Sequence, residues 1–508
     1  MSKPRVIIIG AGMAGMGAAI RLLEAGIPCT IIEAQEEVGG LARSFEIDGK
    51  HFPLGYHHIL SQDKPLLAML KKLDIYKEVS WKKGKVLFAI NNKIYNLENP
   101  IEFLKFPMSL VAKIRFVILM AYCFLKKNWG KDLGNAQVWL DKIAGETVRK
   151  TIFDPLMDIK YGLPSSELSA NWLGSRLHYQ EFSKPLGFIP GTDWTKILNE
   201  KLSEKICALG GIIITNAVVT KINLNNDKFE GLEYAQTETS VIPASSGGGS
   251  AFGGKAGIQY DNVMDSRTLP GIFDLRGNDT TNHIAGDILI NTAPPHIFLK
   301  LIHDAKASDV VFGDKPGLTS PKTTSEALAM PPYKDSQLEK IEYLDALSLI
   351  LETEQKLPRE LYLLSCLKPR YSFGGIFMLS SLNKTIGIQN GTVINFFTTL
   401  SAGSEYLRYK SADELLEIYS RDFEKLFRFS SFGGSTSGGK LKPIWHHLTL
   451  IKNYSPKFLN GYENSAIQGS IKNIYFAGNY LTYPIITSTG SALESGERTA
   501  DMIIDQIF

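Results

Sequence analysis

The first apolar pattern of the chain is a short run, Val6–Ile9, that ends at a glycine. A wholly apolar run of this length is typical of a buried parallel strand. Apolar residues then recur at helical spacing from Ala14 to Ala25, and Gly26 ends the pattern. Thr30–Ile32 is the next apolar run. The pattern therefore predicts a strand, a helix and a second strand at the start of the chain.

The middle of the chain carries a looser pattern. Residues from His51 to about Arg176 are predicted to be mainly helical. Ile212–Ile214 and Val218–Ile222 are predicted to be paired strands. Two segments rich in glycine and serine, Ser245–Gly257 and Ser430–Lys440, interrupt these patterns and are predicted to be surface loops.

The last third of the chain returns to strands. An antiparallel sheet is predicted from four apolar runs, Leu347–Leu351, Leu361–Leu367, Ile376–Leu382 and Val393–Thr399. The chain closes with a predicted strand, Ile474–Ala477, and a helix from about Gly490.

Composition excludes several classes of protein. At 508 residues and 44% hydrophobic content, the chain is long and apolar enough for two cores. A formal charge of +3, from 55 basic and 52 acidic residues, gives no electrostatic reason for a nucleic-acid partner. The four cysteines lie far apart without a CxxC pair, which argues against a disulfide framework or zinc site and favours a reducing, cytosolic compartment.

Two histidine pairs, His57-His58 and His446-His447, are the remaining candidates for a metal site. Neighbouring side chains of an extended chain point to opposite faces, so each pair is poorly placed to chelate one ion. No cysteine or acidic cluster accompanies them, and no metal is expected.

The turn between the first predicted strand and helix reads Gly10-Ala11-Gly12-Met13-Ala14-Gly15. Gly10 permits a tight turn, Gly12 lets the backbone approach a pyrophosphate, and Gly15 lets helix and strand pack closely. The start of the helix then offers N–H groups to phosphates. Glu33, followed by Ala34, ends the second strand, where a carboxylate can accept hydrogen bonds from ribose hydroxyls. Together these features predict a dinucleotide site on a Rossmann unit.

The same segment has a competing interpretation. Lys3 and Arg5 followed by the run Val6–Ile20 resemble the charged and apolar regions of a secretory signal. The run holds four glycines at fixed spacing, however. A dinucleotide motif explains those glycines and a signal does not, so the dinucleotide interpretation is favoured.

Just after Glu33 the chain reads Gly39-Gly40-Leu41-Ala42-Arg43. Here the sequence resembles the large flavoprotein superfamily of amine oxidases, protoporphyrinogen oxidases, carotenoid desaturases and UDP-galactopyranose mutases. The resemblance implies that FAD is the cofactor and that the glycine pair and Arg43 lie against its pyrophosphate and ring edge. It is tight over about the first 60 and last 35 residues.

Further matches to this superfamily are spread along the chain. Gly55-Tyr56-His57-His58 resembles a turn beside the flavin, which makes His57 a candidate proton carrier or polar contact for the ring, with an ordinary loop histidine as the alternative. Val219 matches a position that flanks the adenine, and Thr292 and Ala293 match the end of a Rossmann strand. The C-terminal flavin motif is matched by Gly478, Asn479, Gly490, Ser491 and Ala492.

The resemblance to the C-terminal motif implies that a helix N-terminus points its N–H groups at the flavin ring. Two residues depart from the superfamily pattern. Asn479 stands where Asp or Glu is usual, and Pro53 stands where relatives often carry Asp. We expect weaker cofactor retention from the first and altered local geometry from the second.

The order of these motifs predicts an α/β fold in which a Rossmann-type FAD-binding domain is interleaved with an α+β substrate domain that contains an antiparallel sheet. The FAD-binding domain is assigned to residues 1–60, 195–300 and 470–508. The substrate domain is assigned to residues 61–194 and 301–469.

The resemblance implies an oxidoreductase that removes hydride from a C–N or C–C bond of a largely apolar small molecule and passes electrons to oxygen, a quinone or another acceptor. An isomerase like UDP-galactopyranose mutase and a flavin-retaining binding protein without turnover are the alternatives. The apolar stretch 101–125 holds Phe116–Leu125, bounded by basic residues, and is either a buried helix or a peripheral membrane contact. A cytoplasmic protein, in the second case peripheral to the inner face of the membrane, is expected.

Overall fold

The computed structural model describes residues 3–179, 184–236, 241–242, 280–308, 336–355, 361–389, 391–428 and 441–508. The two glycine- and serine-rich segments, Ser245–Gly257 and Ser430–Lys440, lie outside the described residues. No helix in the described ranges is long and apolar enough to cross a membrane.

The chain begins as its apolar pattern predicts. Strand β1 (Val6–Ile9), helix α1 (Met13–Glu24) and strand β2 (Cys29–Ile32) follow one another, and β1 pairs with β2 in parallel. They belong to a six-stranded sheet of order β13-β10-β2-β1-β15-β21. Its other strands are β10 (Ile212–Ile214), β13 (Val241–Ile242), β15 (Ile288–Asn291) and β21 (Ile474–Phe476).

Side chains of β1 alternate between two cores. Val6 and Ile8 pack with the helices of one face, whereas Ile7 and Ile9 pack with the elements of the other. The helical face holds α1, α2 (Lys64–Lys72), α9 (Trp194–Ala208) and α14 (Thr489–Ile507). The opposite face holds α10 (Pro295–Ser308) and an antiparallel sheet of β11 (Ala217–Asn225), β12 (Lys228–Gln236) and β14 (Thr280–Ala285).

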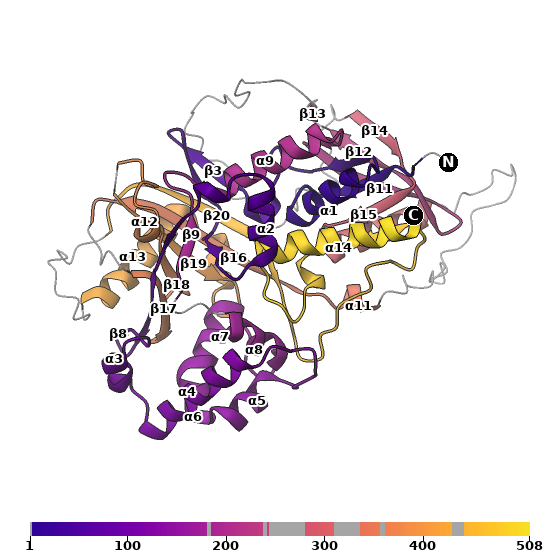
Figure 1. Ribbon diagram of the computed structural model, residues 1–508. Coiled ribbons are helices and arrows are strands. Elements are labelled where there is room, and N and C mark those ends of the chain that lie inside the picture. The colour runs from indigo at the N-terminus through magenta and orange to yellow at the C-terminus, as the bar shows by residue number, and fades with distance from the viewer. Residues whose placement is uncertain are drawn as a thin grey trace, which may run out of the picture.

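The first and last helices lie side by side, which brings the two ends of the chain together (Figure 1). The ammonium group of Lys3 is 5.4 Å from the ring centroid of Phe508. The last helix therefore completes the layer that the first helix begins.

The predicted pairing of residues 212–214 with 218–222 is wrong. Strand β10 extends the parallel sheet beside β2, while β11 pairs with β12. Between them Asn216 adopts a left-handed backbone (φ 51°), and its N–H donates to the carbonyl of Gln35. That turn directs the chain from one sheet into the other, a choice that two short apolar runs do not encode.

The second large sheet has seven strands in the order β20-β16-β19-β18-β17-β7-β8. It confirms the antiparallel sheet expected near the C-terminal third, although β17 and β7 pair in parallel and Leu379–Leu382 forms a helix, α12. The strands are β7 (Lys85–Ile90), β8 (Lys93–Tyr95), β16 (Tyr343–Thr353), β17 (Leu361–Lys368), β18 (Gly375–Met378), β19 (Thr392–Thr399) and β20 (Pro443–Pro456).

The prediction of mainly helical structure from His51 onward is wrong for its first 45 or so residues. Strands β4 (Lys50–Pro53), β5 (Ile59–Leu60), β6 (Ser80–Lys82), β7 and β8 occupy much of that stretch. Strand β7 finds its partner β17 almost 300 residues later in the chain. A pairing over that distance leaves no local signal, which is why helical spacing misleads there.

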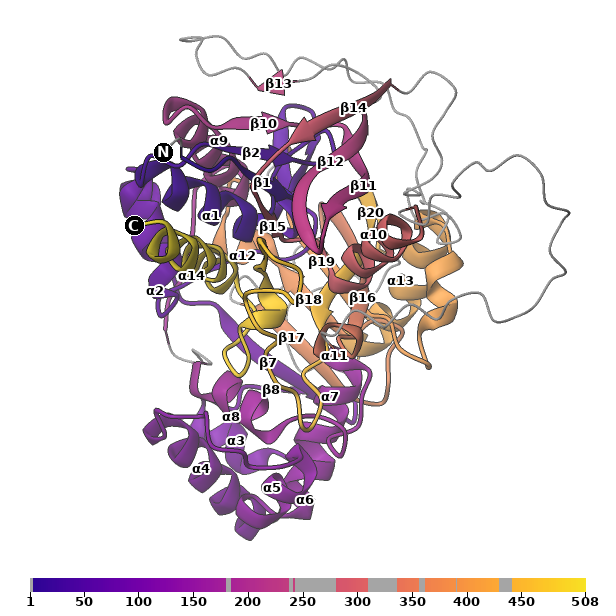
Figure 2. The same ribbon diagram turned by 90° about the vertical axis from the view of Figure 1, so that its right-hand side faces the viewer.

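Helices dominate only beyond Pro100 and form the lower lobe in Figure 2. This lobe comprises α3 (Pro100–Lys105), α4 (Leu110–Leu125), α5 (Ala136–Ile143), α6 (Glu146–Val148), the π-helix η3 (Arg149–Phe153), α7 (Asp154–Tyr161) and α8 (Ala170–Tyr179). The remaining elements are η1 (Gly40–Ala42), β3 (Ser44–Ile47), η2 (Tyr76–Glu78), β9 (Leu186–Phe188), α11 (Ser336–Glu339), η4 (Glu405–Tyr409), α13 (Ala412–Arg428) and η5 (Asn479–Leu481).

Candidate active site

A cavity of about 2080 Å³ extends from the carboxyl ends of β1 and β2 to the inner face of the seven-stranded sheet. Most residues predicted for the cofactor site line it: Gly10, Gly12, Met13, Ala14, Glu33, Ala34, Gly39, Gly40, Leu41, Ala42, Arg43, Gly55, Tyr56, His57, Val219, Thr292, Ala293, Gly478, Asn479 and Ala492. Four predicted residues lie outside the lining: Ala11, Gly15, Gly490 and Ser491.

The glycine turn after β1 has the geometry that its spacing predicts. Gly10 has a left-handed backbone (φ +97°). A Cβ on Gly15 would stand 2.0 Å from the carbonyl oxygen of Gly10, so only glycine allows helix and strand to approach this closely. A Cβ on Gly12 would instead project into open space, with Gly40 Cα, 4.0 Å away, as its nearest neighbour. The turn thus leaves a cradle at Gly12 that fits a pyrophosphate.

The Glu33 carboxylate closes this end of the cavity. It is 8% exposed and accepts hydrogen bonds from the backbone N–H groups of Ala11 (2.7 Å) and Gln35 (3.0 Å). Burial raises the pKa of Glu33, while these N–H groups and the charge of Arg43 act in the opposite direction. The carboxylate therefore lies at the end of β2, where the predicted ribose contact requires it.

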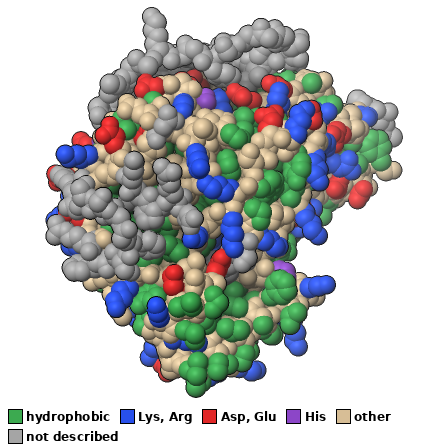
Figure 3. Space-filling view, turned by 60° about the vertical axis from the view of Figure 1, so that its left-hand side comes forward, with side chains coloured by type: hydrophobic (Ala, Val, Ile, Leu, Met, Phe, Trp, Pro, Cys, Tyr) green, Lys and Arg blue, Asp and Glu red, His purple; other side chains and the backbone are tan. Residues whose placement is uncertain are grey.

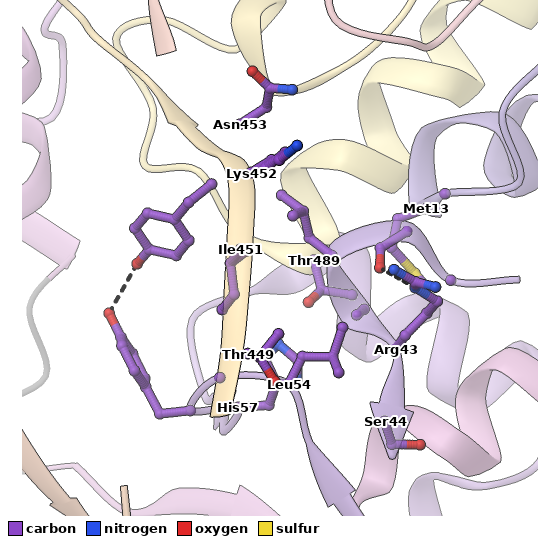
Figure 4. A pocket seen from close by; sticks show the side chains of 18 of the residues that line it. Met13, Arg43, Ser44, Leu54, His57, Thr449, Ile451, Lys452, Asn453 and Thr489 are labelled. Carbon is purple, nitrogen blue, oxygen red and sulfur yellow. Dashed lines mark hydrogen bonds between the residues drawn. The ribbon is translucent and has the colours of Figure 1, made fainter. Parts of the chain in front are cut away.

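The Gly39-Gly40 pair packs directly on the first glycine turn. The N–H of Gly39 donates to the carbonyl of Ala11 at 2.8 Å, and Arg43 Nε donates to the carbonyl of Gly40 at 3.1 Å. Figure 4 shows Arg43 and Met13 on one side of the cavity and Ile451 and Lys452, from β20, on another.

Asn199, on α9, holds the Gly39-Gly40 segment from behind. It is buried, and its Nδ2 donates to the carbonyl of Ala42 at 2.8 Å. A Cβ on Gly39 would lie 2.3 Å from the same nitrogen. Asn199 carries no sequence signal of this role, because it stands in an ordinary helix, far along the chain from the motif it supports.

The start of α14 differs from what the resemblance implied. The N–H of Gly490 donates to the carboxylate of Asp63 (3.2 Å), and the N–H of Ser491 donates to Ser488 Oγ (3.0 Å). Neither N–H is therefore free to reach a flavin ring in this conformation. Asp63 also caps α2 by accepting from Leu66 N–H, and burial raises the pKa of its carboxyl group. In the sequence, Asp63 shows only the signal of a helix cap at the start of α2 and none of its contact with α14.

The far end of the cavity is aromatic. Tyr56 stacks on Phe377 with ring centroids 3.6 Å apart, and its hydroxyl lies 3.1 Å from that of Tyr454. Phe397 meets Tyr56 edge-on at 5.0 Å. These rings come from the Gly55 turn and from strands β18, β19 and β20.

The two neighbouring histidines of the turn have different partners. His58 Nδ1 lies 2.6 Å from the hydroxyl of Tyr362, and burial lowers the pKa of His58 to about 4. His57 Nδ1 lies 3.9 Å from the carboxylate of Asp193 and is buried without a hydrogen-bond partner. His57 lines the cavity, while its unsatisfied Nδ1 is buried on the side of Asp193. Among the described residues, no group of three or more His, Cys, Asp or Glu side chains could hold a metal ion.

Known proteins resemble this chain in sequence and in fold. Residues 13–246 match the family described as flavin containing amine oxidoreductase. An L-amino-acid oxidase from Crotalus adamanteus is 32% identical over 108 residues, which are 20% of this chain and 21% of the relative. A 15-cis-phytoene desaturase from Glycine max is 24% identical over 255 residues, 44% of each chain. The chain thus spans less than half the length of these curated relatives.

Solved structures share the fold over almost the whole chain. A putative protoporphyrinogen oxidase from Exiguobacterium sp. 255-15 superposes with a TM-score of 0.68 at 13% identity, covering 100% of both chains. A reduced UDP-galactopyranose mutase superposes with a TM-score of 0.63 at 14% identity, covering 99% of this chain and 96% of that one. The predicted interleaved fold class is confirmed, while the residue boundaries assigned to the two domains stay a prediction. These findings confirm the predicted resemblance to the flavin-containing amine oxidoreductases, whose family model matches residues 13–246, and with the glycine cradle they support FAD as the cofactor.

Proposed function

We propose that this protein is an FAD-dependent oxidoreductase that removes hydride from a C–N or C–C bond of a largely apolar small molecule. The supporting observation is the continuity of one cavity from the nucleotide cradle at Gly12 and Glu33 to the aromatic chamber at Tyr56, Phe377 and Phe397. A cofactor held in the cradle would reach a substrate held between the rings. The aromatic walls would orient that substrate and exclude water.

The cofactor residues are assigned on the same basis. Glu33 would bind the ribose, the turn at Gly12 the pyrophosphate, and the Gly39-Gly40 pair with Arg43 the edge of the flavin. Bound FAD supplies the hydride acceptor and passes the electrons to oxygen, a quinone or another acceptor. His57, which lines the cavity and has its Nδ1 3.9 Å from the carboxylate of Asp193, is the residue proposed to carry the substrate proton.

A membrane surface is the proposed source of the substrate. Helix α4 turns an apolar stripe outward at helical spacing, and each of its side chains is more than half exposed: Leu110, Val111, Ile114, Val117, Ile118, Phe124 and Leu125. Figure 3 shows hydrophobic side chains gathered on the lower lobe, with lysines and arginines near its margins. Such a patch on a water-exposed helix is typical of a membrane or partner contact.

This stripe differs from the segment that the sequence singled out. Phe116 is half-buried and Leu119 is fully buried, so the inner face of α4 is core. Lys113 turns inward and donates to the carbonyl of Leu104 (2.6 Å), whereas Lys105 and Lys127 are exposed beside the stripe. The inner face of α4 is therefore packed in the lobe, and its exposed outer face is the part to which the membrane proposal applies.

A redox-neutral isomerase of a nucleotide sugar is the second candidate. The observation that favours it is the presence of two cations, Lys160 and Arg176, in the cavity wall, since phosphates require such groups. The aromatic chamber and the apolar stripe favour the oxidoreductase. A flavin-retaining protein without turnover is the third possibility.

Anaerobic titration of the purified holoprotein discriminates among the three. An oxidoreductase begins with oxidised flavin, so its substrate must bleach the flavin absorbance, and an added acceptor must restore it. Amines, porphyrinogens and polyene precursors would be screened in the oxidised state and nucleotide sugars after reduction with dithionite. Turnover of a nucleotide sugar only in the reduced state would overturn the oxidoreductase proposal, and absence of any turnover would favour the binding protein.

A further inference from the structure

Two cations lie together in the aromatic end of the cavity. Lys160 is near the end of α7 and Arg176 is on α8, and both side chains line the cavity wall. The charge of Arg176 acts on Lys160, and the phenols of Tyr56, Tyr161 and Tyr454 act on Arg176, with no carboxylate of the described chain among these groups. These two positive charges therefore have no acidic partner within the part of the protein that the structure describes.

Two other enclosed cations, Arg149 and Arg408, are paired with acids, whereas the buried Lys113 donates to a backbone carbonyl. Arg149 donates to the carboxylates of Asp141 (2.8 Å) and Asp154 (2.6 Å). Arg408 donates to Asp345 at 2.8 Å and also to Glu405. Unpaired charge in an enclosed site is costly, because it loses hydration without gaining a counter-ion. The contrast marks Lys160 and Arg176 as a site that gains most from an anion supplied from outside.

The surroundings of Arg176 hold it in place. Its guanidinium carbon is 5.7 Å from the ring centroid of Tyr161 and 6.0 Å from that of Trp172. The Tyr161 hydroxyl is buried and has no hydrogen-bond partner. Burial and the charge of Arg176 lower the pKa of Lys160 to about 7. An anionic oxygen between the two cations would pair with both charges and could accept a hydrogen bond from the Tyr161 hydroxyl.

We propose that Lys160 and Arg176 bind an anionic group, a carboxylate or a phosphate, of an otherwise apolar substrate whose body lies against Tyr56, Phe377 and Phe397. This inference rests on the proposed function and narrows its substrate to apolar organic acids. Two cations suit one anionic group, and the Arg fork can bind two of its oxygens at once. The stacked rings next to them suit an apolar body.

Ligand binding to the oxidised holoprotein tests the site without requiring turnover. The probes are phenylacetate, its neutral analogue phenylacetamide, phenyl phosphate and UDP, with affinities measured by calorimetry and by perturbation of the flavin spectrum. We expect an aromatic anion to bind at least about tenfold more tightly than the amide. Preference for phenylacetate would assign a carboxylate, and preference for phenyl phosphate a phosphate.

Matched variants connect that binding to the two side chains. Lys160→Met and Arg176→Met should each lower the affinity for the preferred anion about ten- to a hundredfold, and Arg176→Lys should have an intermediate affinity. Lys150→Gln, at an exposed lysine in the same lobe, should bind like the wild type. Flavin content and melting temperature are recorded for each. If Arg176→Met does not fold, Lys160→Met and Arg176→Lys carry the test.

Several results would overturn the inference. They are equal binding of acid and amide, unchanged affinity in both the Lys160 and Arg176 variants, or no saturable binding of either aromatic anion. Binding of UDP alone would overturn the apolar-acid class. If an aromatic anion binds as expected but no compound bleaches the flavin, the anion site stands and the proposed oxidation fails, so the two failures are distinguishable.

Discussion

The Glu33 carboxylate accepts a hydrogen bond of 2.7 Å from the backbone N–H of Ala11. This contact joins the end of β2 to the glycine turn after β1. Glu33 therefore has a structural role in shaping the turn in addition to the proposed contact with the cofactor ribose. Its second oxygen accepts from the N–H of Gln35, so the carboxylate holds both sides of the nucleotide end of the cavity.

Replacement of this carboxylate should release FAD. Glu33→Ala removes charge-assisted hydrogen bonds that are worth roughly 1.5–3 kcal/mol, so the affinity for FAD should fall about ten- to a hundredfold. Glu33→Gln keeps one acceptor and should be intermediate. Flavin fluorescence during dilution measures the loss. A Glu33→Ala protein that keeps its full flavin complement would show that the ribose lies elsewhere.

Two glycines of the same turn should respond differently to one methyl group. Gly15→Ala places a Cβ 2.0 Å from the Gly10 carbonyl, so the apoprotein should lose about 1–3 kcal/mol of stability or more. In Gly12→Ala the added Cβ meets no protein atom closer than 4.0 Å, so the stability of the apoprotein should be unchanged. The affinity for FAD should fall at least about tenfold. Thermal melting of apoprotein and FAD titration separate the two effects. Equal melting losses in both variants would contradict the open cradle.

Membrane binding should depend on the outer face of α4. Val117→Glu with Phe124→Glu should abolish co-sedimentation with anionic vesicles and keep bound flavin, because both side chains are more than half exposed. Tyr406→Glu with Tyr409→Glu provides the matched control, since these apolar side chains are equally exposed on a different element. The wild type should bind neutral vesicles less tightly. Wild-type protein that stays in the supernatant with anionic vesicles would disprove the contact.

Binding of an aromatic anion should weaken as the pH rises. Lys160 has a pKa of about 7, so it is charged below pH 7 and must take up a proton to pair with an anion above it. The affinity for the anion should be constant below about pH 6. Above pH 7 it should fall as the pH rises, by up to about tenfold per pH unit. Lys160→Met should remove this dependence, and a level wild-type profile would contradict the role of Lys160.

The other groups that face Lys160 do not account for such a profile. Arg176 stays charged throughout. His58, whose pKa is lowered to about 4 by burial, stays neutral above pH 6. The phenols of Tyr161 and Tyr454, whose pKa values burial raises, stay protonated, and Tyr56 is the remaining neighbour.

Local chemistry made the first part of the fold predictable. Gly10, Gly12 and Gly15 act through backbone conformation and close approach, which depend on neighbours only a few residues away. The alternation of Val6–Ile9 between two cores and the end of β2 at Glu33 follow from the same short segment. For that reason the glycine turn and the carboxylate at the end of β2 could be located from the sequence.

Distant pairings decided the rest. The partner of β7 is almost 300 residues away, and Asn199 and Asp63 support motifs far from them in the chain, so no local spacing records these contacts. The exposure of the apolar stripe on α4 depends on which face of that helix packs against the rest of the lobe. The sequence by itself determined a Rossmann unit with its glycine cradle and a resemblance to flavoproteins. Only the tertiary structure placed Lys160 and Arg176 in one wall with no counter-charge among the described residues, because that relation exists only once two helices and two sheets pack around the same cavity.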